Sequence, residues 1–185
     1  MIKNFYKIAL VGDSGVGKSS FIHTYIDGKF PENLLETIGV ELFTAHLQTD
    51  DQFVIFRVWD LGGHERFFGI HQIYVEGVVM GFVFYDLTNP LSIKNVNKWV
   101  TLLRTVNPFV PILLIGTKLD LISEPSANEI RNNPFFTQFN AEDHFLLSSK
   151  TGKNIRIVFE TASRFLMNKK YNPIVSMDRV KLFDM

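Results

Sequence analysis

A glycine-rich segment of eight residues near the N-terminus constrains this chain more than any other feature of its sequence. GDSGVGKS, from Gly12 to Ser19, fits the pattern G-x-x-x-x-G-K-[S/T] and directly follows the apolar, strand-like run Ile8 to Val11. A loop of this pattern between a strand and a helix is typical of a phosphate-binding P-loop. The alternative, a glycine-rich turn that matches by chance, is rare at average composition. The segment therefore predicts a site for nucleotide phosphates.

Each residue type in the segment suits such a site. Gly12 and Gly17 permit backbone angles that are closed to other residues, so consecutive N–H groups can point at the phosphates. Lys18 supplies a positive charge for β- and γ-phosphate oxygens, and the Ser19 hydroxyl is a ligand for Mg²⁺. A helix that opens near Gly17 adds its positive dipole end to the anion site. The segment from Gly12 to Ser19 is therefore the predicted contact for the phosphates.

Length and charge exclude several classes of protein. The chain has 185 residues, of which 46% are hydrophobic, so we expect one domain with a packed core rather than a disordered segment. Nineteen basic residues balance nineteen acidic ones. This balance leaves no charge excess to attract nucleic acid or an anionic membrane.

Signals for direct attachment to a membrane are also missing. The longest apolar stretch, Gly77 to Tyr85, is too short to span a bilayer, and no signal-peptide pattern is present. Prenylation and palmitoylation need a cysteine, which the chain lacks, and Ile2 stands where myristoylation needs glycine. We therefore expect a cytoplasmic protein without a direct lipid anchor, which associates with a membrane only through a partner.

Apolar runs alternate with amphipathic stretches, which predicts an α/β fold. A short polar link after residue 48 predicts one antiparallel edge strand in a mostly parallel, six-stranded sheet with helices on both faces. Prolines and asparagines predict an irregular connection over residues 119–140, with one short helix near 126–131. Expected strands are residues 3–11, 40–48, 53–60, 77–86, 111–117 and 145–148, and the other expected helices are residues 18–26, 92–106 and 154–168.

A second motif indicates which base the site binds. TKLD, from Thr117 to Asp120, ends a buried strand, where open α/β sheets bind ligands. The Asp120 carboxylate can accept hydrogen bonds from both N1–H and N2–H₂ of guanine, a donor pair that adenine lacks. The alternative is an ordinary strand-to-loop turn closed by an Asx hydrogen bond.

With these two motifs in order, the chain resembles the Ras superfamily of small GTPases from about Tyr6 to Leu166. The first switch of that family appears as ETIGVE, residues 36–41, which is most similar to the Rab branch, and the second switch appears as WDLGGHE, residues 59–65. Ser148, Ser149 and Lys150 stand at the family's second base-binding motif, and Phe30 stands where an aromatic ring packs against guanine. The resemblance implies a single P-loop GTPase domain over residues 1–170, followed by a tail, 171–185, without a lipidation motif.

The resemblance assigns roles to these residues. Lys18 faces the β- and γ-phosphates, Gly63 donates its N–H to the γ-phosphate, and His64 stands at the catalytic position. Mg²⁺ is held by Ser19, Thr37 and Asp60. The implied phosphate cradle comprises Ser14, Gly15, Val16, Gly17, Lys18, Ser19 and Ser20. The rest of the implied nucleotide site is Phe30, Thr37, Gly63, Thr117, Lys118, Asp120, Ser148, Ser149 and Lys150.

The same resemblance implies a monomeric GTP/GDP switch in membrane traffic or signalling. Loss of the γ-phosphate removes the contacts of Thr37 and Gly63, so both switch loops relax and the surface offered to partners changes. The implied partners are effectors, an exchange factor and a GTPase-activating protein.

The second switch departs from the usual family pattern. Leu61 and Gly62 give an Arf-like D-L-G-G, and Leu42 stands where Rab proteins mostly have phenylalanine, although Trp59 and Tyr74 keep the rest of their effector-facing triad. His64 replaces the glutamine that orients the attacking water, so we expect slow hydrolysis unless a partner positions the ring. The other histidines, His23, His46, His71 and His144, lack ligand spacing and are expected to be surface or hydrogen-bonded residues.

Two other functions remain open at this point. The His64 substitution alone favours a scaffold that holds GTP permanently with negligible hydrolysis. An ATP-dependent P-loop kinase is disfavoured by TKLD and by the absence of an arginine-rich lid.

Overall fold

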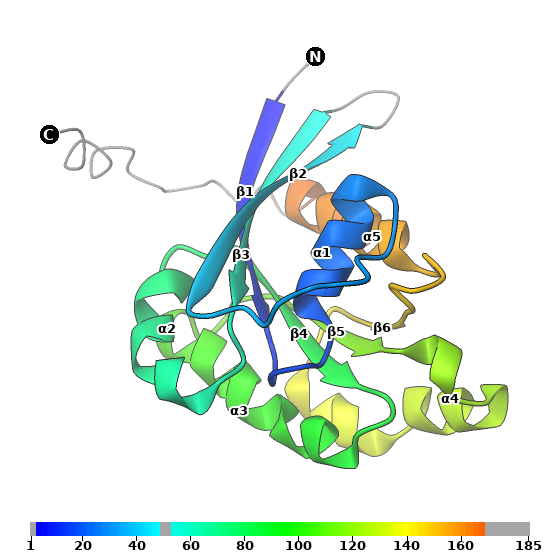
Figure 1. Cartoon of the computed structure of the whole chain (residues 1–185). Helices are drawn as coiled ribbons and strands as arrows, with labels where there is room; N and C mark the ends of the chain where they lie inside the picture. The colour runs from blue at the N-terminus through cyan, green and yellow to red at the C-terminus, as the bar shows by residue number, and fades with distance from the viewer. Residues whose placement is uncertain (1–2, 49–52, 169–185) are drawn as a thin grey trace, which may run out of the picture.

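A six-stranded sheet lies at the centre of the computed structural model, which describes residues 3–48 and 53–168 (Figure 1). The spatial order of the strands is β2-β3-β1-β4-β5-β6, so β1 lies inside the sheet. Their bounds are β1 Lys3–Val11, β2 Val40–Gln48, β3 Phe53–Leu61, β4 Met80–Asp86, β5 Ile112–Thr117 and β6 Asp143–Leu146.

All neighbouring strands except one pair run parallel. β1 pairs with β3 and β4, and β5 pairs with β4 and β6, in parallel register. The edge strand β2 runs antiparallel to β3, with Phe43 opposite Val58. The predicted α/β fold with one antiparallel edge strand is therefore confirmed, whereas the predicted link at 49–51 and the tail at 171–185 lie outside the described residues.

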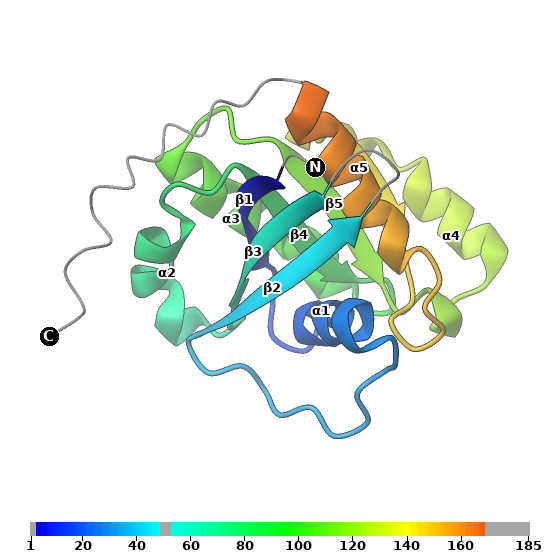
Figure 2. The ribbon, with the colours of Figure 1, turned by 90° about the horizontal axis from the view of Figure 1, so that it is seen from above.

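Helices cover both faces of the sheet (Figure 2). α1, Lys18–Asp27, and α5, Ile155–Asn168, bury Phe21, Ile22 and Phe159 against one face. The helices that cover the other face are α2, Phe68–Val75, α3, Pro90–Val106, and α4, Glu124–Arg131. None of the helices in the described ranges is long and apolar enough to cross a membrane.

The observed helices and strands differ from the predicted ones at three places. The sequence pattern did not predict α2, because its eight residues have no side-chain cap and only His71 and Val75 are buried. β4 begins at Met80 rather than at residue 77, because Gly77 has a φ of 71° and turns the chain before the strand. The last strand spans 143–146 rather than 145–148, since its pairing with β5 ends at Leu146.

His71 is neither a surface residue nor hydrogen-bonded, contrary to expectation. Its side chain is fully buried, and neither ring nitrogen has a hydrogen-bond partner among the described residues. The ring packs beside Phe68 and Trp99, with centroid distances of 6.1 and 5.9 Å. Burial, with smaller effects of the positive charges on Lys18 and Lys98, lowers the pKa of His71 to about 4. The folded protein therefore binds a proton at this ring less readily than the unfolded chain does.

We expect His71→Leu to reduce the loss of stability in mild acid. An unfolded histidine takes up a proton near pH 6.5 but the folded one only near pH 4, so the folded state loses stability as the pH falls through this window. Between pH 7 and pH 5, protonation of this histidine in the unfolded chain lowers the free energy of unfolding by about 2 kcal/mol. The decrease over this range should therefore be about 2 kcal/mol smaller in His71→Leu than in wild type. Urea titrations at both pH values measure it, with the exposed His46→Leu as control. Equal decreases in wild type and His71→Leu would contradict the assignment.

Candidate functional site

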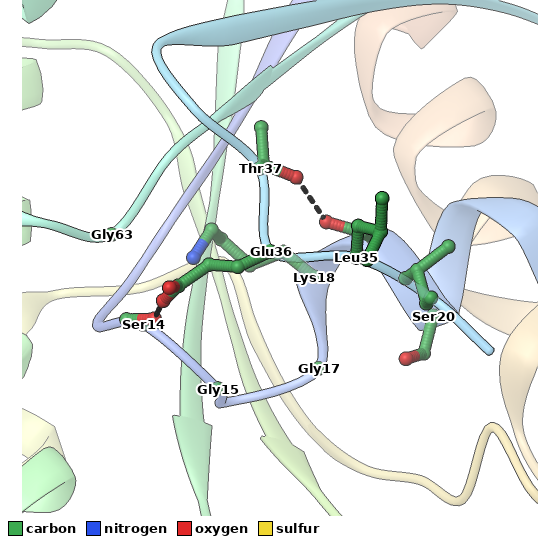
Figure 3. A pocket seen from close by; sticks show the side chains of 11 residues that line it. Ser14, Gly15, Gly17, Lys18, Ser20, Leu35, Glu36, Thr37 and Gly63 are labelled. Atoms are coloured by element: carbon green, nitrogen blue, oxygen red, sulfur yellow. Dashed lines mark hydrogen bonds between the residues drawn. The ribbon is translucent and has the colours of Figure 1, made fainter.

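Four loops meet at the carboxyl-terminal edge of the sheet. β1 leads into the P-loop, β3 into Gly62 and Gly63, β5 into Lys118, and β6 into the segment that begins at Leu147. Since the carboxyl ends of parallel strands lie at one edge, these loops surround a common site. The connection between α1 and β2, residues 28–39, closes it from the front (Figure 3).

The P-loop has the backbone geometry that a phosphate cradle requires. Gly17 caps α1 with a φ of 96°, in the left-handed region that favours glycine. Lys18 is 5% exposed, and its Nζ donates to the carbonyls of Gly12 and Asp13, each at 2.9 Å. Burial lowers the pKa of Lys18 to about 8, while the nearby carboxylates oppose this shift. A buried cation lined up with backbone donors is suited to bind phosphate oxygens.

α3 holds the P-loop through Asp13. One carboxylate oxygen accepts a hydrogen bond from the Trp99 indole at 2.7 Å, and the other accepts one from the Asn95 amide at 2.8 Å. No sequence motif indicated this contact, because the partners are 82 and 86 residues apart in the chain. It fixes the cradle against the helix layer.

Ser19, Thr37 and Asp60 come together as the predicted metal ligands. The two hydroxyls are 2.8 Å apart, and Asp60 Oδ2 accepts from Ser19 at 2.5 Å and from Thr37 at 3.4 Å. Asp60 Oδ1 is buried without a hydrogen-bond partner among the described residues, and burial raises the pKa of this carboxyl. Within residues 3–48 and 53–168, no group of three or more histidine, aspartate or glutamate side chains is placed to hold a metal ion. A hard cation that takes oxygen ligands, such as Mg²⁺, fits the set and would satisfy the buried oxygen.

The paired glycines after β3 lie against the other two loops. The Gly62 N–H donates to the Gly39 carbonyl at 2.8 Å, and a Cβ at Gly62 would come within 2.5 Å of the Thr37 carbonyl oxygen. A Cβ at Gly63 would come within 2.1 Å of the Ser14 backbone nitrogen. Both positions therefore require glycine, and they place the start of the second switch directly on the P-loop and the first switch.

A cavity of about 190 Å³, the base cavity, lies beside the P-loop. It contains the predicted base-binding residues except Ser148, with Asp120 on its wall and the exposed ring of Phe30 at its side. It is lined by Gly15, Gly17, Ser20, Phe30, Thr117, Lys118, Asp120, Leu121, Ser149 and Lys150. This is a slot with one carboxylate, one aromatic ring and two lysines, suited to a flat polar base.

Neighbouring side chains orient the walls of this cavity. Ser148 Oγ donates to Asp120 Oδ1 at 2.5 Å, so Ser148 holds Asp120 rather than lining the cavity itself. Thr117 Oγ1 donates to the Val16 carbonyl at 2.5 Å, which joins β5 to the P-loop. Lys118 Nζ lies 2.6 Å from Asp86 Oδ2. Burial would raise the pKa of Asp86, but hydrogen bonds from Lys118 and Thr88 outweigh it and lower that pKa below its ordinary value.

The phosphate pocket, of about 340 Å³, shares Gly15, Gly17 and Ser20 with the base cavity. It is lined by Ser14, Gly15, Gly17, Lys18, Ser19, Ser20, Leu34, Leu35, Glu36, Thr37 and Gly63, most of which Figure 3 labels.

Not every predicted site residue lines a cavity. The side chain of Val16 packs in the core under the loop, and Asp60 lies behind Ser19 and Thr37. His64 is absent from the lining of both cavities.

Glu36 is the charged residue of this pocket to which the sequence motifs assign no role. Its carboxylate contacts the Ser14 hydroxyl through Oε1 (Figure 3) and lies 2.8 Å from His64 Nε2 through Oε2. It therefore connects the P-loop to both switches. The only sequence signal was its place directly before Thr37.

Comparisons with known proteins agree with this geometry. The Ras family model matches residues 7–168. The chain is 34% identical over 168 residues to "Ras-related protein Rab5A" of Oryza sativa subsp. japonica, which covers 89% of this chain and 81% of that protein. It is 32% identical over 170 residues to "Ras-related protein Rab-2B" of Dictyostelium discoideum, covering 90% and 83%.

The match to the family model spans the whole of the site, from the P-loop at Gly12 to Lys150, so both cavities and the hydroxyl–carboxylate set fall within the shared domain. The likeness to Rab proteins confirms the resemblance noted from the switch motifs. The chain belongs to the Ras family of small GTPases.

Proposed function

We propose that this protein alternates between GTP-bound and GDP-bound forms and hydrolyses GTP slowly. One observation carries the proposal: the cavity with the Asp120 carboxylate shares three lining residues with the pocket that contains Lys18. A guanine base and its phosphates can therefore occupy the two cavities together. In this proposal Ser149 and Lys150 border the base, and Ser148 orients Asp120.

The reaction breaks the bond between the γ-phosphorus and the β–γ bridging oxygen. A water oxygen forms the new bond to phosphorus, the electron pair of the broken bond stays on GDP, and the water protons end on inorganic phosphate and solvent. Lys18 and the Gly63 N–H stabilise the γ-phosphate oxygens, and His64 acts at the position of the missing glutamine. When Mg²⁺ is bound by Ser19, Thr37 and Asp60, it supplies positive charge for the phosphate oxygens.

Purified protein should hydrolyse bound GTP no faster than roughly 10⁻⁴ s⁻¹, the order of an unassisted Ras protein. The glutamine amide that normally orients water is absent, and an imidazole needs a second group to hold it in place. Single-turnover release of phosphate from the GTP-loaded protein measures the rate. A rate on the order of 1 s⁻¹ or more without a partner would contradict slow hydrolysis.

The switch segments offer a partner surface. Leu42 lies opposite Trp59 in the register of β2 and β3, and the rings of Trp59 and Tyr74 lie 5.5 Å apart. Leu42 is 61% exposed and Ile73 on α2 is 68% exposed, so apolar side chains that follow each switch in the chain face solvent. We propose that effectors, an exchange factor and a GTPase-activating protein bind a monomer of this protein here.

We further propose action in membrane traffic, by analogy with the Rab proteins it resembles. In this proposal residues 1–170 form the GTPase domain, 171–185 form a tail, and the protein is cytoplasmic until a partner recruits it. Protein of this sequence, which offers no cysteine for a prenyl or palmitoyl chain, should not float with uncharged vesicles in either nucleotide form, because even a single such chain binds membranes only marginally. Robust co-flotation would contradict recruitment by a partner.

Ser19→Asn should weaken GTP binding more than GDP binding. The longer amide displaces the ligand oxygen next to Thr37 and Asp60, and the metal contributes most where it contacts the γ-phosphate. We expect the ratio of GTP to GDP affinity to fall roughly tenfold in Mg²⁺. Competition binding measures the ratio, and the same assay in EDTA is the control, because the difference should vanish there. Equal loss for both nucleotides in Mg²⁺ would remove Ser19 from the metal site.

A further inference from the structure

Glu36 links three parts of the site through its side chain, on the side of the pocket away from the Ser19, Thr37 and Asp60 set. It lies in the first switch, contacts Ser14 of the P-loop through Oε1, and approaches His64 of the second switch within 2.8 Å through Oε2. Figure 3 shows its side chain reaching across the pocket toward Ser14, beside Lys18. Among the described residues that line this pocket, Glu36 is the only acidic one.

Of the two partners, Glu36 rather than His64 faces the phosphates. Glu36 lines the phosphate pocket together with Lys18 and Gly63, and His64 does not. The Glu36 side chain is 51% exposed and that of His64 is 39% exposed. Both side chains are partly exposed, and only that of Glu36 belongs to the wall of the pocket, which it shares with Gly63.

The chemistry of the pair fixes which group donates. A carboxylate only accepts hydrogen bonds, so His64 Nε2 carries the hydrogen that lies between the two side chains. Two carboxylate oxygens offer about four acceptor sites. Ser14 and His64 use one each, which leaves acceptor capacity for a water molecule in the pocket.

The positive charge of Lys18 offsets the negative charge that Glu36 brings close to the phosphates. Glu36 and Lys18 line the same pocket, so their opposite charges lie close together. A carboxylate beside the γ-phosphate is therefore not isolated. The donor hydrogens of Ser14 and His64 stabilise it further.

We infer that Glu36 accepts the hydrogen bond that orients the attacking water, and that His64 is a positioning residue which holds the Glu36 carboxylate through Nε2–H. This rests on the proposed GTP hydrolysis and deepens it, because the Glu36–His64 pair takes the place of the missing glutamine. The water oxygen still forms the bond to the γ-phosphorus, and GDP leaves with the electron pair of the bridging oxygen.

Single-turnover hydrolysis of preloaded GTP in Mg²⁺ tests the pair. Glu36→Ala should slow hydrolysis by roughly tenfold or more, and His64→Ala should slow it less. The double variant should hydrolyse at the rate of Glu36→Ala, because the two residues act as one unit. His64→Gln should keep or raise the rate, since its amide N–H can still donate to the carboxylate and a glutamine at this position can itself orient the water. Glu32→Gln, an exposed glutamate in the same segment, is the control.

Nucleotide affinity separates this inference from the proposed function. Affinity for GTP and GDP should stay within about threefold of wild type in Glu36→Ala and in the double variant, because an oriented water contributes to the rate rather than to binding. An unchanged or faster rate in Glu36→Ala, with GTP binding intact, would overturn the role of Glu36 alone. A larger loss of rate in His64→Ala than in Glu36→Ala would also overturn it, because His64 rather than Glu36 would then orient the water. Failure of the wild type to bind GTP would instead overturn the proposed function, and Glu36 with it.

Discussion

Asp120→Asn is expected to change the base preference of this protein from guanine to xanthine. In the proposed site the wild-type carboxylate accepts from N1–H and N2–H₂ of guanine, whereas an asparagine amide donates to the carbonyl at position 2 of xanthine. Sites built around such hydrogen bonds reject the wrong partner strongly, so the ratio of GTP to XTP affinity should fall by about 10³-fold or more. Competition of both nucleotides against a fluorescent analogue measures it.

The structure gives this prediction a sharp control. Ser148 Oγ can donate to an amide oxygen as well as to a carboxylate, so the variant side chain keeps its orientation. Glu129→Gln removes a negative charge from an exposed position on α4 and should leave the ratio unchanged. An unaltered preference in Asp120→Asn would mean that another group reads the base.

Lys18→Ala should lower the affinity for GTP by about 10²–10³-fold, as expected for the loss of a buried charge partner worth roughly 3–5 kcal/mol. Lys18 is the buried cation of the phosphate pocket. Its Nζ donates hydrogen bonds to the carbonyls of Gly12 and Asp13, which hold the side chain along the loop. GTP should lose more affinity than GDP, because the γ-phosphate adds charge at the same place.

Lys94→Ala, an exposed lysine on α3, is the matched control for the change in net charge. Titration calorimetry on both variants measures the two affinities, and a thermal unfolding curve shows whether Lys18→Ala remains folded. A folded Lys18→Ala protein with wild-type GTP affinity would contradict the role of this lysine.

Local patterns predicted the parts of the site that are encoded within a few residues. The P-loop needs its glycines and Lys18 at fixed spacing, and TKLD needs only to end a strand, so the amino-acid sequence alone is enough to place both. The alternation of apolar runs predicted the strands in the same way. Burial in a parallel sheet imposes these patterns on every strand of the centre.

Features that depend on long-range contacts could not be predicted. Nothing near Asp13 in the sequence indicates that Trp99 will donate to it, and nothing near Ser148 indicates that it will orient Asp120. Glu36 precedes Thr37 in a motif that drew attention to the threonine. Its contacts to Ser14 and His64 arise only when three loops meet at one edge of the sheet.

α2 was missed because tertiary packing rather than local preference stabilises it. Its sequence contains Gly69 and the β-branched residues Ile70, Ile73 and Val75, which are weak helix formers. Contacts of Phe68 and His71 with Trp99 on α3 compensate for this. A helix with so little intrinsic preference is also suited to a segment that must rearrange with the bound nucleotide.

The nucleotide carried by freshly purified protein tests the central claim most directly. The protein is denatured without added nucleotide, and the released compound is identified by chromatography against guanine and adenine standards. A guanine nucleotide switch that hydrolyses slowly but completely should release GDP in about equal amount to the protein. Predominant GTP would contradict cycling and indicate a permanently loaded scaffold, and adenine nucleotide would contradict the assignment of Asp120 and of the base cavity.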